Sequence, residues 1–299
     1  MRFDCIGFGA LNVDRLHHVK HIAKGGEESI VTEHKVHPGG SAGNTIVALA
    51  RLGNKVGYVG KLADDESGKF LLQNFKEEGV NTWGVVLSKT GMTGEVMGYV
   101  DKKGERALYV ESGVNDALEF EEVDLVYVSS ADFLHLTSFI GERPFLSQQR
   151  VVESLTSARI SLDPGMIYAS LGLEKIRPLL RHTYVAFPNA LELNLLTGEG
   201  PQKGSGILMA EGVQIVAVKL GDAGCYVTDG DAEYWVKAFP VEAVDTTGAG
   251  DAFCAGFLHG LISGKSIEIC GRLGNIVASK KIVTSGAREG LPRRKDLDF

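Results

Sequence analysis

The chain has 299 residues, of which 44% are hydrophobic and 23% are charged, and these values are ordinary for a folded globular protein. Its formal net charge is −7, and no cluster of Lys or Arg exists beyond "PRRK" near the C-terminus, which argues against a nucleic-acid partner. The N-terminus turns polar too early for a signal peptide, and no apolar run is long enough to span a membrane. The four cysteines are scattered and form no C-x-x-C pair, as in a reducing compartment, so we expect a cytoplasmic protein.

In chain order, short apolar runs alternate with helical patterns. "FDCIGFG" predicts a buried strand over residues 3–9, and "SAGNTIVALARLG" predicts a helix that ends at Gly53. "KVGYVGKLA" predicts the next strand, and "ESGKFLLQNFKEEG" predicts a helix closed by Gly79. After residue 120 the alternation continues through "DFLHLT", "RISLD", "TYVAFPN" and "VQIVAVKLG". This pattern predicts an α/β fold, with a mainly parallel central sheet flanked by helices on both faces, in one domain over residues 1–299.

Two regions interrupt the alternation. Residues 13–37 are polar and rich in histidine, and residues 92–112 resemble two strands joined at "DKKG". Neither region has the length of a strand–helix unit, so we expect both to form a small separate sheet. No carboxylate or Cys accompanies the histidines of these regions at the spacing of metal ligands, so we interpret them as solvent-exposed. They are His17, His18, His21, His34 and His37.

The stretch "AVDTTGAGDAFCAGF", residues 243–257, carries the strongest chemical signal. Gly248, Ala249 and Gly250 precede an apolar helical pattern, so their backbone N–H groups should lie at a helix N-terminus, where anions such as phosphate bind. Asp251 follows in the first helical turn. An acidic residue there also favours helix initiation by itself, but one capping residue would suffice for that purpose. We therefore interpret Asp251 as a general base that removes a proton from a hydroxyl beside a bound phosphate.

Together with "HPGGSAGNTIVALARLG", this stretch resembles the signatures of the ribokinase (PfkB) family of carbohydrate and nucleoside kinases. The resemblance extends from "GALNVD" to "SGA" at residues 285–287. It implies a ribokinase-like three-layer sandwich whose small β-sheet, from segments 13–37 and 92–112, acts as a lid. It also implies an ATP-dependent kinase that uses Mg²⁺ and phosphorylates a hydroxymethyl group of a small sugar of the ribose, fructose or keto-deoxy sugar acid type. An exposed lid sheet often serves as a dimer surface in this family, which suggests a homodimer.

The resemblance also implies roles for individual residues. Asp251 corresponds to the catalytic base, and the amides of Gly248, Ala249 and Gly250 correspond to the anion hole for the transferred γ-phosphoryl group. Substrate binding is assigned to Asn12, Asp14, Gly39, Gly40, Asn44 and Asp251, with the two adjacent glycines as the hinge of the lid. Nucleotide binding is assigned to Asn189, Glu192, Lys219, Gly221, Gly224, Gly248, Gly250 and Asn275. Glu192 also corresponds to the residue that organises Mg²⁺ through water. Asp245 and the carbonyl of Thr247 correspond to a monovalent-cation loop, which holds K⁺ in many members.

Several of these residues also have a simpler interpretation. Gly39 and Gly40 fit an ordinary loop before a helix, and Asn189 fits a helix cap. Asp163 lies in "LDPG" at the end of a predicted strand, but Pro-Gly signals a turn, so its role stays open.

Other functions stay open beside the sugar kinase. A nucleoside kinase of the same family would use the same residues and would need an apolar or aromatic wall beside Asp14, for which Tyr109 and Phe133 are candidates. A non-catalytic sugar- or nucleotide-binding protein is a second alternative, but the intact Asp251 and Glu192 argue against it. An NAD-dependent oxidoreductase is not supported, because "GFGALN" lacks the third glycine of a dinucleotide-binding fingerprint.

Overall fold

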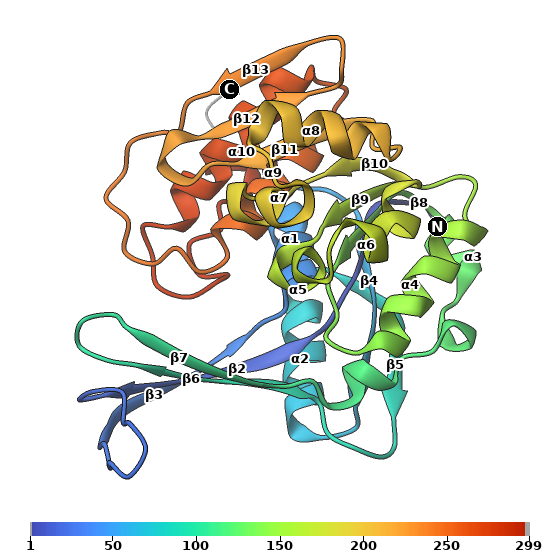
Figure 1. Cartoon of the computed structure of the whole chain (residues 1–299). Helices are drawn as coiled ribbons and strands as arrows, with labels where there is room; N and C mark the ends of the chain where they lie inside the picture. The colour runs from blue at the N-terminus through green and yellow to red at the C-terminus, as the bar shows by residue number, and fades with distance from the viewer. Residues whose placement is uncertain (1, 297–299) are drawn as a thin grey trace.

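The computed structural model describes residues 2–296, and a nine-stranded sheet forms its centre (Figure 1). The strand order is β13-β12-β11-β10-β9-β8-β1-β4-β5. All neighbours from β5 to β11 in this order are parallel, whereas β12 and β13 at one edge are antiparallel. The mainly parallel sheet expected from the sequence is therefore confirmed. The strands are β1 Phe3–Phe8, β4 Val56–Ala63, β5 Asn81–Ser88, β8 Ala131–Thr137, β9 Arg159–Asp163, β10 Thr183–Ala186, β11 Ile215–Lys219, β12 Cys225–Thr228 and β13 Glu233–Val236.

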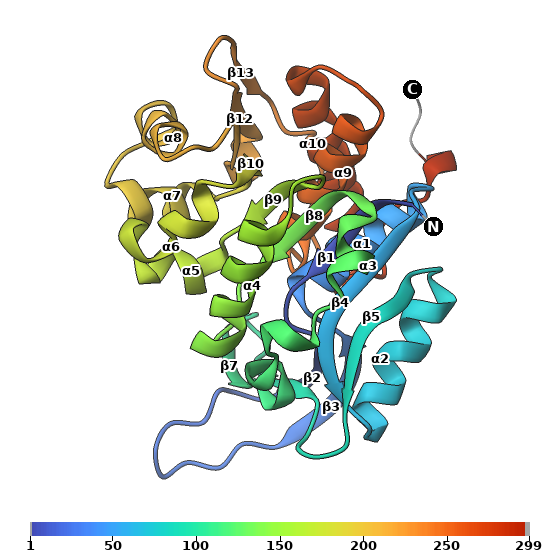
Figure 2. The ribbon, with the colours of Figure 1, turned by 90° about the vertical axis from the view of Figure 1, so that its right-hand side faces the viewer.

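Helices cover both faces of this sheet (Figure 2). Successive residues of a strand point to opposite faces, and Cys5 and Ile6 of β1 accordingly lie in two different hydrophobic clusters. The cluster around Cys5 includes residues of α1 Ser41–Arg51, α2 Glu66–Glu77, α9 Ala249–Ile262 and α10 Ile267–Lys281. The cluster around Ile6 includes residues of α3 Leu125–Ser129, α4 Glu142–Ser154, α5 Gly165–Leu171, α6 Leu173–Leu180, α7 Ala190–Thr197 and α8 Pro201–Ala210. The result is a three-layer sandwich.

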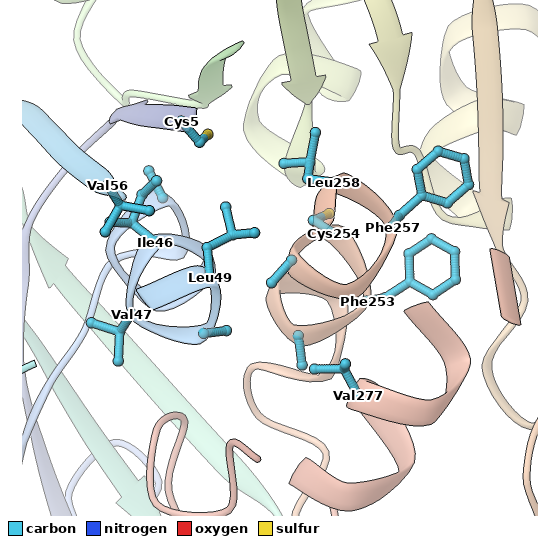
Figure 3. Packing of buried hydrophobic residues seen from close by; sticks show 14 of the residues in the cluster. Cys5, Ile46, Val47, Leu49, Val56, Phe253, Cys254, Phe257, Leu258 and Val277 are labelled. Carbon is cyan, nitrogen blue, oxygen red and sulfur yellow. The ribbon is translucent and has the colours of Figure 1, made fainter. Parts of the chain in front are cut away.

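Helices α1 and α9 pack against each other within the first cluster (Figure 3). Ile46 and Leu49 of α1 and Leu258 of α9 are fully buried there, and each such side chain stabilises the fold by roughly 1.5–3 kcal/mol. This packing fixes the N-terminal turns of the two helices relative to one another. As a consequence, Asn44 near the start of α1 lies within hydrogen-bond distance of Asp251 near the start of α9.

A second, smaller sheet projects from the main body (Figure 1). Its strand order is β3-β2-β6-β7, with β2 and β6 parallel and the outer pairs antiparallel. The strands are β2 Asn12–Val19, β3 Val31–Pro38, β6 Gly94–Val100 and β7 Arg106–Glu111. The separate sheet expected from the two interrupting regions is thus confirmed. Large apolar side chains on its outer strands are exposed, among them Val31 and Leu108, and the homodimer through this sheet stays a prediction.

The structure describes no membrane-spanning helix, disulfide or cluster of metal ligands within residues 2–296. No helix there is both long and apolar enough to cross a lipid bilayer. All four cysteines are free and buried. The histidines of the smaller sheet contact other side chains: His17 stacks on Tyr99 and His34, and His37 Nδ1 lies 2.8 Å from Glu289 Oε1. No group of three or more His, Cys, Asp or Glu in this range could hold a metal ion.

Candidate active site

Two cavities meet at the N-terminal end of α9. The larger has a volume of about 700 Å³ and the smaller about 390 Å³, and Gly250 and Asp251 line both. Thr137, Asp163 and Lys219, the last residues of β8, β9 and β11, also line the larger cavity. Ligands of parallel α/β sheets bind at this carboxyl edge of the strands. Asp251 therefore lies where the contents of the two cavities would come into contact.

The turn that begins α9 presents free backbone amides to these cavities. Gly248 has a φ of 77°, and a Cβ atom on it would lie 2.9 Å from the carbonyl oxygen of Ala287, so the position requires glycine. The amide of Ala249 donates to the carbonyl oxygen of Thr246 at 3.1 Å and is already used. The amides of Gly248 and Gly250 donate no hydrogen bond to residues 2–296. Of the three amides predicted for the anion hole, these two are free to bind an anion.

Asp251 has the properties that a general base requires. Its Oδ2 accepts a hydrogen bond of 2.8 Å from Nδ2 of Asn44. Burial raises the pKa of Asp251 to about 6, although the hydrogen bond from Asn44 acts in the opposite direction. At neutral pH the carboxylate is mostly ionised, and it is more basic than an exposed aspartate. It can therefore accept a proton from a hydroxyl group in the smaller cavity.

Arg288, which the sequence analysis did not identify, connects this base to the smaller sheet. Its Nε donates to Oδ1 of Asn44 at 2.8 Å, its Nη1 to Oδ1 of Asn74 at 2.6 Å, and its Nη2 to the carbonyl oxygen of Gly39 at 3.1 Å. The amide group of Asn44 is thus held on one side by Arg288 and on the other by Asp251. Asn44 was predicted to bind the substrate; its side chain lines the smaller cavity and is also hydrogen-bonded to Asp251.

The smaller cavity contains most of the residues predicted to bind the substrate: Asn12, Asp14, Gly40, Asn44 and Asp251. Gly39 does not line it, because it lies directly behind Asp14, where a Cβ atom would be within 2.3 Å of Asp14 Oδ1. No side-chain hydrogen bond to Asp14 is formed by residues 2–296, and burial raises its pKa to about 6 against the opposing charges of Arg288 and His37. An unpartnered carboxylate that faces a cavity can accept hydrogen bonds from hydroxyl groups of a ligand.

Two further polar residues of this cavity were not predicted. Asn115 and Asp116 lie in the short 3₁₀ turn η1, Gly113–Ala117, directly after the smaller sheet. The side chain of Asn115 bonds to both backbone groups of Leu11 and donates to Oδ1 of Asn12 at 3.0 Å. Oδ1 of Asp116 accepts a hydrogen bond of 2.9 Å from the amide of Gly141. No motif surrounds these two residues in the sequence, and only their spatial position identifies them.

The two residues named as candidates for an aromatic wall beside Asp14, Tyr109 and Phe133, do not line this cavity. Phe133 points into the core, where it is fully buried and contacts the ring of Tyr184. Tyr109 lines a different cavity, together with Met97 and Tyr99 of the smaller sheet. Side chains of a strand alternate between its faces, and it is the neighbouring residue Val110 that faces the site. The large apolar residues that line the cavity are all aliphatic: Val96, Val110, Ile140 and Ile167.

The larger cavity contains nearly all residues predicted to bind the nucleotide, and these are Asn189, Glu192, Lys219, Gly221, Gly224, Gly250 and Asn275. Gly248 is the exception, since it lines the smaller cavity. Oδ1 of Asn189 accepts from the amide of Glu192, and Oε2 of Glu192 accepts from the amide of Asn189, both at 2.8 Å. This reciprocal cap begins α7 and confirms the simpler interpretation of Asn189. Nδ2 of Asn275 donates to the carbonyl oxygens of Val236 and Lys237 and so fixes the chain beside the cavity.

Lys219 and Asp163 form an ion pair next to the Gly248–Gly250 turn. Nζ of Lys219 lies 2.6 Å from Oδ2 of Asp163, and it would be 3.4 Å from a Cβ atom on Gly250. Burial alone would lower the pKa of Lys219, but the charge of Asp163 reverses this effect and raises it. The lysine therefore stays protonated and places a positive charge next to the Gly248–Gly250 turn. Asp163, whose role the sequence left open, holds this charge in position.

The residues of the larger cavity also fit a magnesium ion that enters with a nucleotide. Glu192 and Asp163 line the cavity, and both burial and the charge of Asp163 raise the pKa of Glu192. Mg²⁺ is usually held by one or two carboxylates, by phosphate oxygens and by water, so it does not need a cluster of protein ligands. Glu192 is the carboxylate that would face the ion, since Asp163 is already paired with Lys219.

The comparisons with known proteins agree with this arrangement. The family model described as "pfkB family carbohydrate kinase" matches residues 3–294. A sugar kinase of Archaeoglobus fulgidus, described as uncharacterised, is 46% identical over 253 residues, which are 84% of this chain and 100% of that protein. The 2-dehydro-3-deoxygluconokinase of Bacillus subtilis is 31% identical over 277 residues, 86% of this chain and 84% of that protein. The chain belongs to the PfkB family of carbohydrate kinases.

Solved structures confirm the fold. Arabidopsis thaliana ribokinase, in a complex with ribose and ATP, superposes with a TM-score of 0.89 at 26% sequence identity, over 99% of this chain and 97% of that chain. The ribokinase-like fold predicted from the sequence is therefore correct. Family membership and these relatives define the protein as an ATP-dependent kinase of the carbohydrate-kinase class.

Proposed function

We propose that the protein transfers the γ-phosphoryl group of ATP to a hydroxymethyl group of a small sugar. The observation that carries this proposal is the meeting of the two cavities at Gly250 and Asp251. ATP would occupy the larger cavity and the sugar the smaller one. The transferred group would then pass across the N-terminal turn of α9, where the dipole of the helix and its free amides favour negative charge.

In this mechanism Asp251 takes the proton of the attacking hydroxyl group, and Asn44 holds its carboxylate in position. The amides of Gly248 and Gly250 and the ammonium group of Lys219 stabilise the charge on the phosphoryl oxygens. Phosphoryl transfer depends mainly on such positioning and charge stabilisation. Mg²⁺ bound with ATP would neutralise further negative charge, with Glu192 facing it. Closure of the smaller sheet as a lid, with Gly39 and Gly40 as its hinge, would exclude water from the reaction.

The charges of the smaller cavity favour an uncharged sugar as the acceptor. Asp14, Asp116 and Asp251 line it, and three carboxylates would repel a substrate that carries a phosphate or carboxylate group. A keto-deoxy sugar acid would need a cation at the rim. Arg106 of β7 is placed to supply one, because its Nη1 donates to Oγ1 of Thr247 at 3.1 Å. We therefore propose a ribose- or fructose-like sugar as the first choice and a sugar acid bound by Arg106 as the second.

A nucleoside acceptor is less well supported. Aliphatic side chains give the cavity an apolar wall, but the candidate aromatic residues Tyr109 and Phe133 lie elsewhere, and none of the lining residues within 2–296 offers a ring that could stack on a base. A non-catalytic binding protein would not require a buried base next to free amides and a buried lysine. Each of these two alternatives predicts a result different from that of a sugar kinase when ATP consumption is measured.

The test is ATP consumption by the purified protein with Mg²⁺ and a panel of acceptors: ribose, fructose, 2-keto-3-deoxygluconate, fructose 6-phosphate, adenosine, guanosine and cytidine. We expect an uncharged sugar to have the highest kcat/KM. If the sugar acid is preferred, Arg106→Met should remove that preference and leave turnover of the neutral sugars unchanged. A preference for a nucleoside would refute the proposed acceptor class. Binding of ATP and sugar without turnover would refute the proposed reaction.

A further inference from the structure

Lys281, the last residue of α10, is a buried charged residue outside the reaction described above. Its relative accessibility is 0%, and its Nζ donates to the backbone oxygen of Asp245 at 2.8 Å. A buried ammonium group loses its hydration and must be compensated by protein oxygens or negative charges. Burial lowers the pKa of Lys281, whereas the nearby carboxylates of Asp245, Glu289 and Asp251 act in the opposite direction. The surroundings are therefore those of a site for a single positive charge.

Asp245 begins the loop that carries the free amides. Its Oδ1 accepts from the amide of Thr247 and its Oδ2 from the amide of Gly286, both at 2.9 Å. Thr247 is followed directly by Gly248, which packs against the carbonyl group of Ala287. The orientation of Asp245 therefore determines where the Gly248–Gly250 turn lies. Lys281 fixes the remaining oxygen of this residue, its carbonyl.

The resemblance to the family implied a monovalent cation such as K⁺ at Asp245 and the carbonyl of Thr247, and the surroundings of Asp245 do not fit it. A K⁺ ion needs several oxygen ligands that point at one position. All three oxygens of Asp245 already accept hydrogen bonds from donors of this chain. An ammonium group in contact with the carbonyl oxygen would also repel a second cation placed there.

We propose that the ammonium group of Lys281 replaces the monovalent cation, so that the enzyme needs no K⁺. The chain itself then supplies the positive charge that orients the Asp245 carbonyl and the loop after it. Lys281 is a positioning residue, because it acts on Gly248 and Gly250 through Asp245. The inference depends on the proposed function only in that this turn receives the phosphoryl group.

The first test compares kinase activity in potassium chloride and in choline chloride at equal ionic strength, with the preferred sugar. Wild-type activity should agree in the two salts within about twofold, since general screening is the same. Lys281→Ala removes the charge and leaves space, so kcat in choline should fall by about 10- to 100-fold and recover in potassium or ammonium chloride. Lys281→Met fills the space without a charge, so its low activity should not recover. Lys280→Ala, at an exposed neighbouring position, should behave like the wild type.

The second test is thermal unfolding of the same variants without substrates. Because a bound ion stabilises the folded state, Lys281→Ala should melt about 2–4 °C higher in potassium chloride than in choline chloride. The wild type and Lys281→Met should melt at the same temperature in both salts. This comparison does not depend on which substrate the enzyme uses, so it can fail or succeed independently of the proposed function.

Two results would overturn the inference. One is strong activation of the wild type by K⁺, which would mean that a cation still binds beside Lys281. The other is a Lys281→Ala protein whose melting temperature and activity are the same in both salts, which would show that the lysine is only a packing element. If Lys281→Ala does not fold in either salt, the wild-type comparison still shows whether K⁺ activates the enzyme. Lys281→Met then shows whether the charge matters, because wild-type activity of this variant would mean that the lysine is only a packing element.

Discussion

Asp251→Asn is the most direct test of the reaction, because the change preserves shape and removes basicity. The oxygen of the new amide can still accept the hydrogen bond from Asn44, so the network with Arg288 should persist. We expect kcat to fall by about 10²- to 10⁴-fold, the usual effect of removing a positioned general base, with little change in either KM. Asp231→Asn, at an exposed position, is the matched control and should have no effect.

The same substitution should stabilise the folded protein. Raising the pKa of Asp251 from 3.8 to about 6 means that its ionisation costs the folded state about 3 kcal/mol. This cost is absent below a pH of 3.8, where the group is protonated in both states, and it is complete above about 6. Asparagine does not ionise, so the variant should melt a few degrees higher than the wild type at about pH 8. The difference should disappear as the pH falls toward about 4.

The assay is calorimetry across this pH range together with steady-state kinetics. Turnover like that of the wild type would remove Asp251 from the mechanism. An inactive variant that is also less stable than the wild type at neutral pH would refute the reasoning in another way, because it would show that the carboxylate contributes to the fold.

Three further predictions follow from the geometry. The value of kcat/KM should rise with pH through about 6 and then level off, because Asp251 must be ionised to act as a base, and a flat profile there would contradict this role. Asp14→Ala should raise the KM for the sugar by about 10- to 100-fold and leave the KM for ATP unchanged, whereas a rise in both would assign Asp14 to closure of the lid. Gly248→Ala should reduce kcat far more than Gly250→Ala. A Cβ atom on residue 248 would lie 2.9 Å from the carbonyl oxygen of Ala287, whereas one on residue 250 would lie 3.4 Å from Nζ of Lys219. Equal losses of kcat in the two variants would contradict this geometry.

The sequence was sufficient for the fold because alternation of strands and helices is a local property of the chain. The interrupted pattern at residues 13–37 and 92–112 likewise identified the smaller sheet. The glycine turn and the carboxylate at the start of α9 could be predicted because Gly248, Gly250 and Asp251 lie within four positions. Contacts between distant segments could not be predicted from local sequence patterns. Arg288 donates a hydrogen bond to Asn44, for example, and these two residues are 244 positions apart. For Phe133 the strand was correct but the position beside Asp14 was not, because Phe133 lies near the start of β8 and is buried in the core, whereas Thr137 at the end of that strand lines the cavity.

The guanidinium group of Arg288 also has an evolutionary consequence. It has polar partners in two separate segments, which are Gly39 and Asn44 at the start of α1 and Asn74 in α2. Loss of the arginine would leave these groups without a donor in a buried environment, and loss of Asn74 or Asn44 would leave part of the guanidinium group unpaired. These positions are therefore expected to change together. Among relatives, a chain with another residue in place of Arg288 should also differ at the position of Asn74, and an ancestor that exchanged them one at a time would have passed through a less stable intermediate.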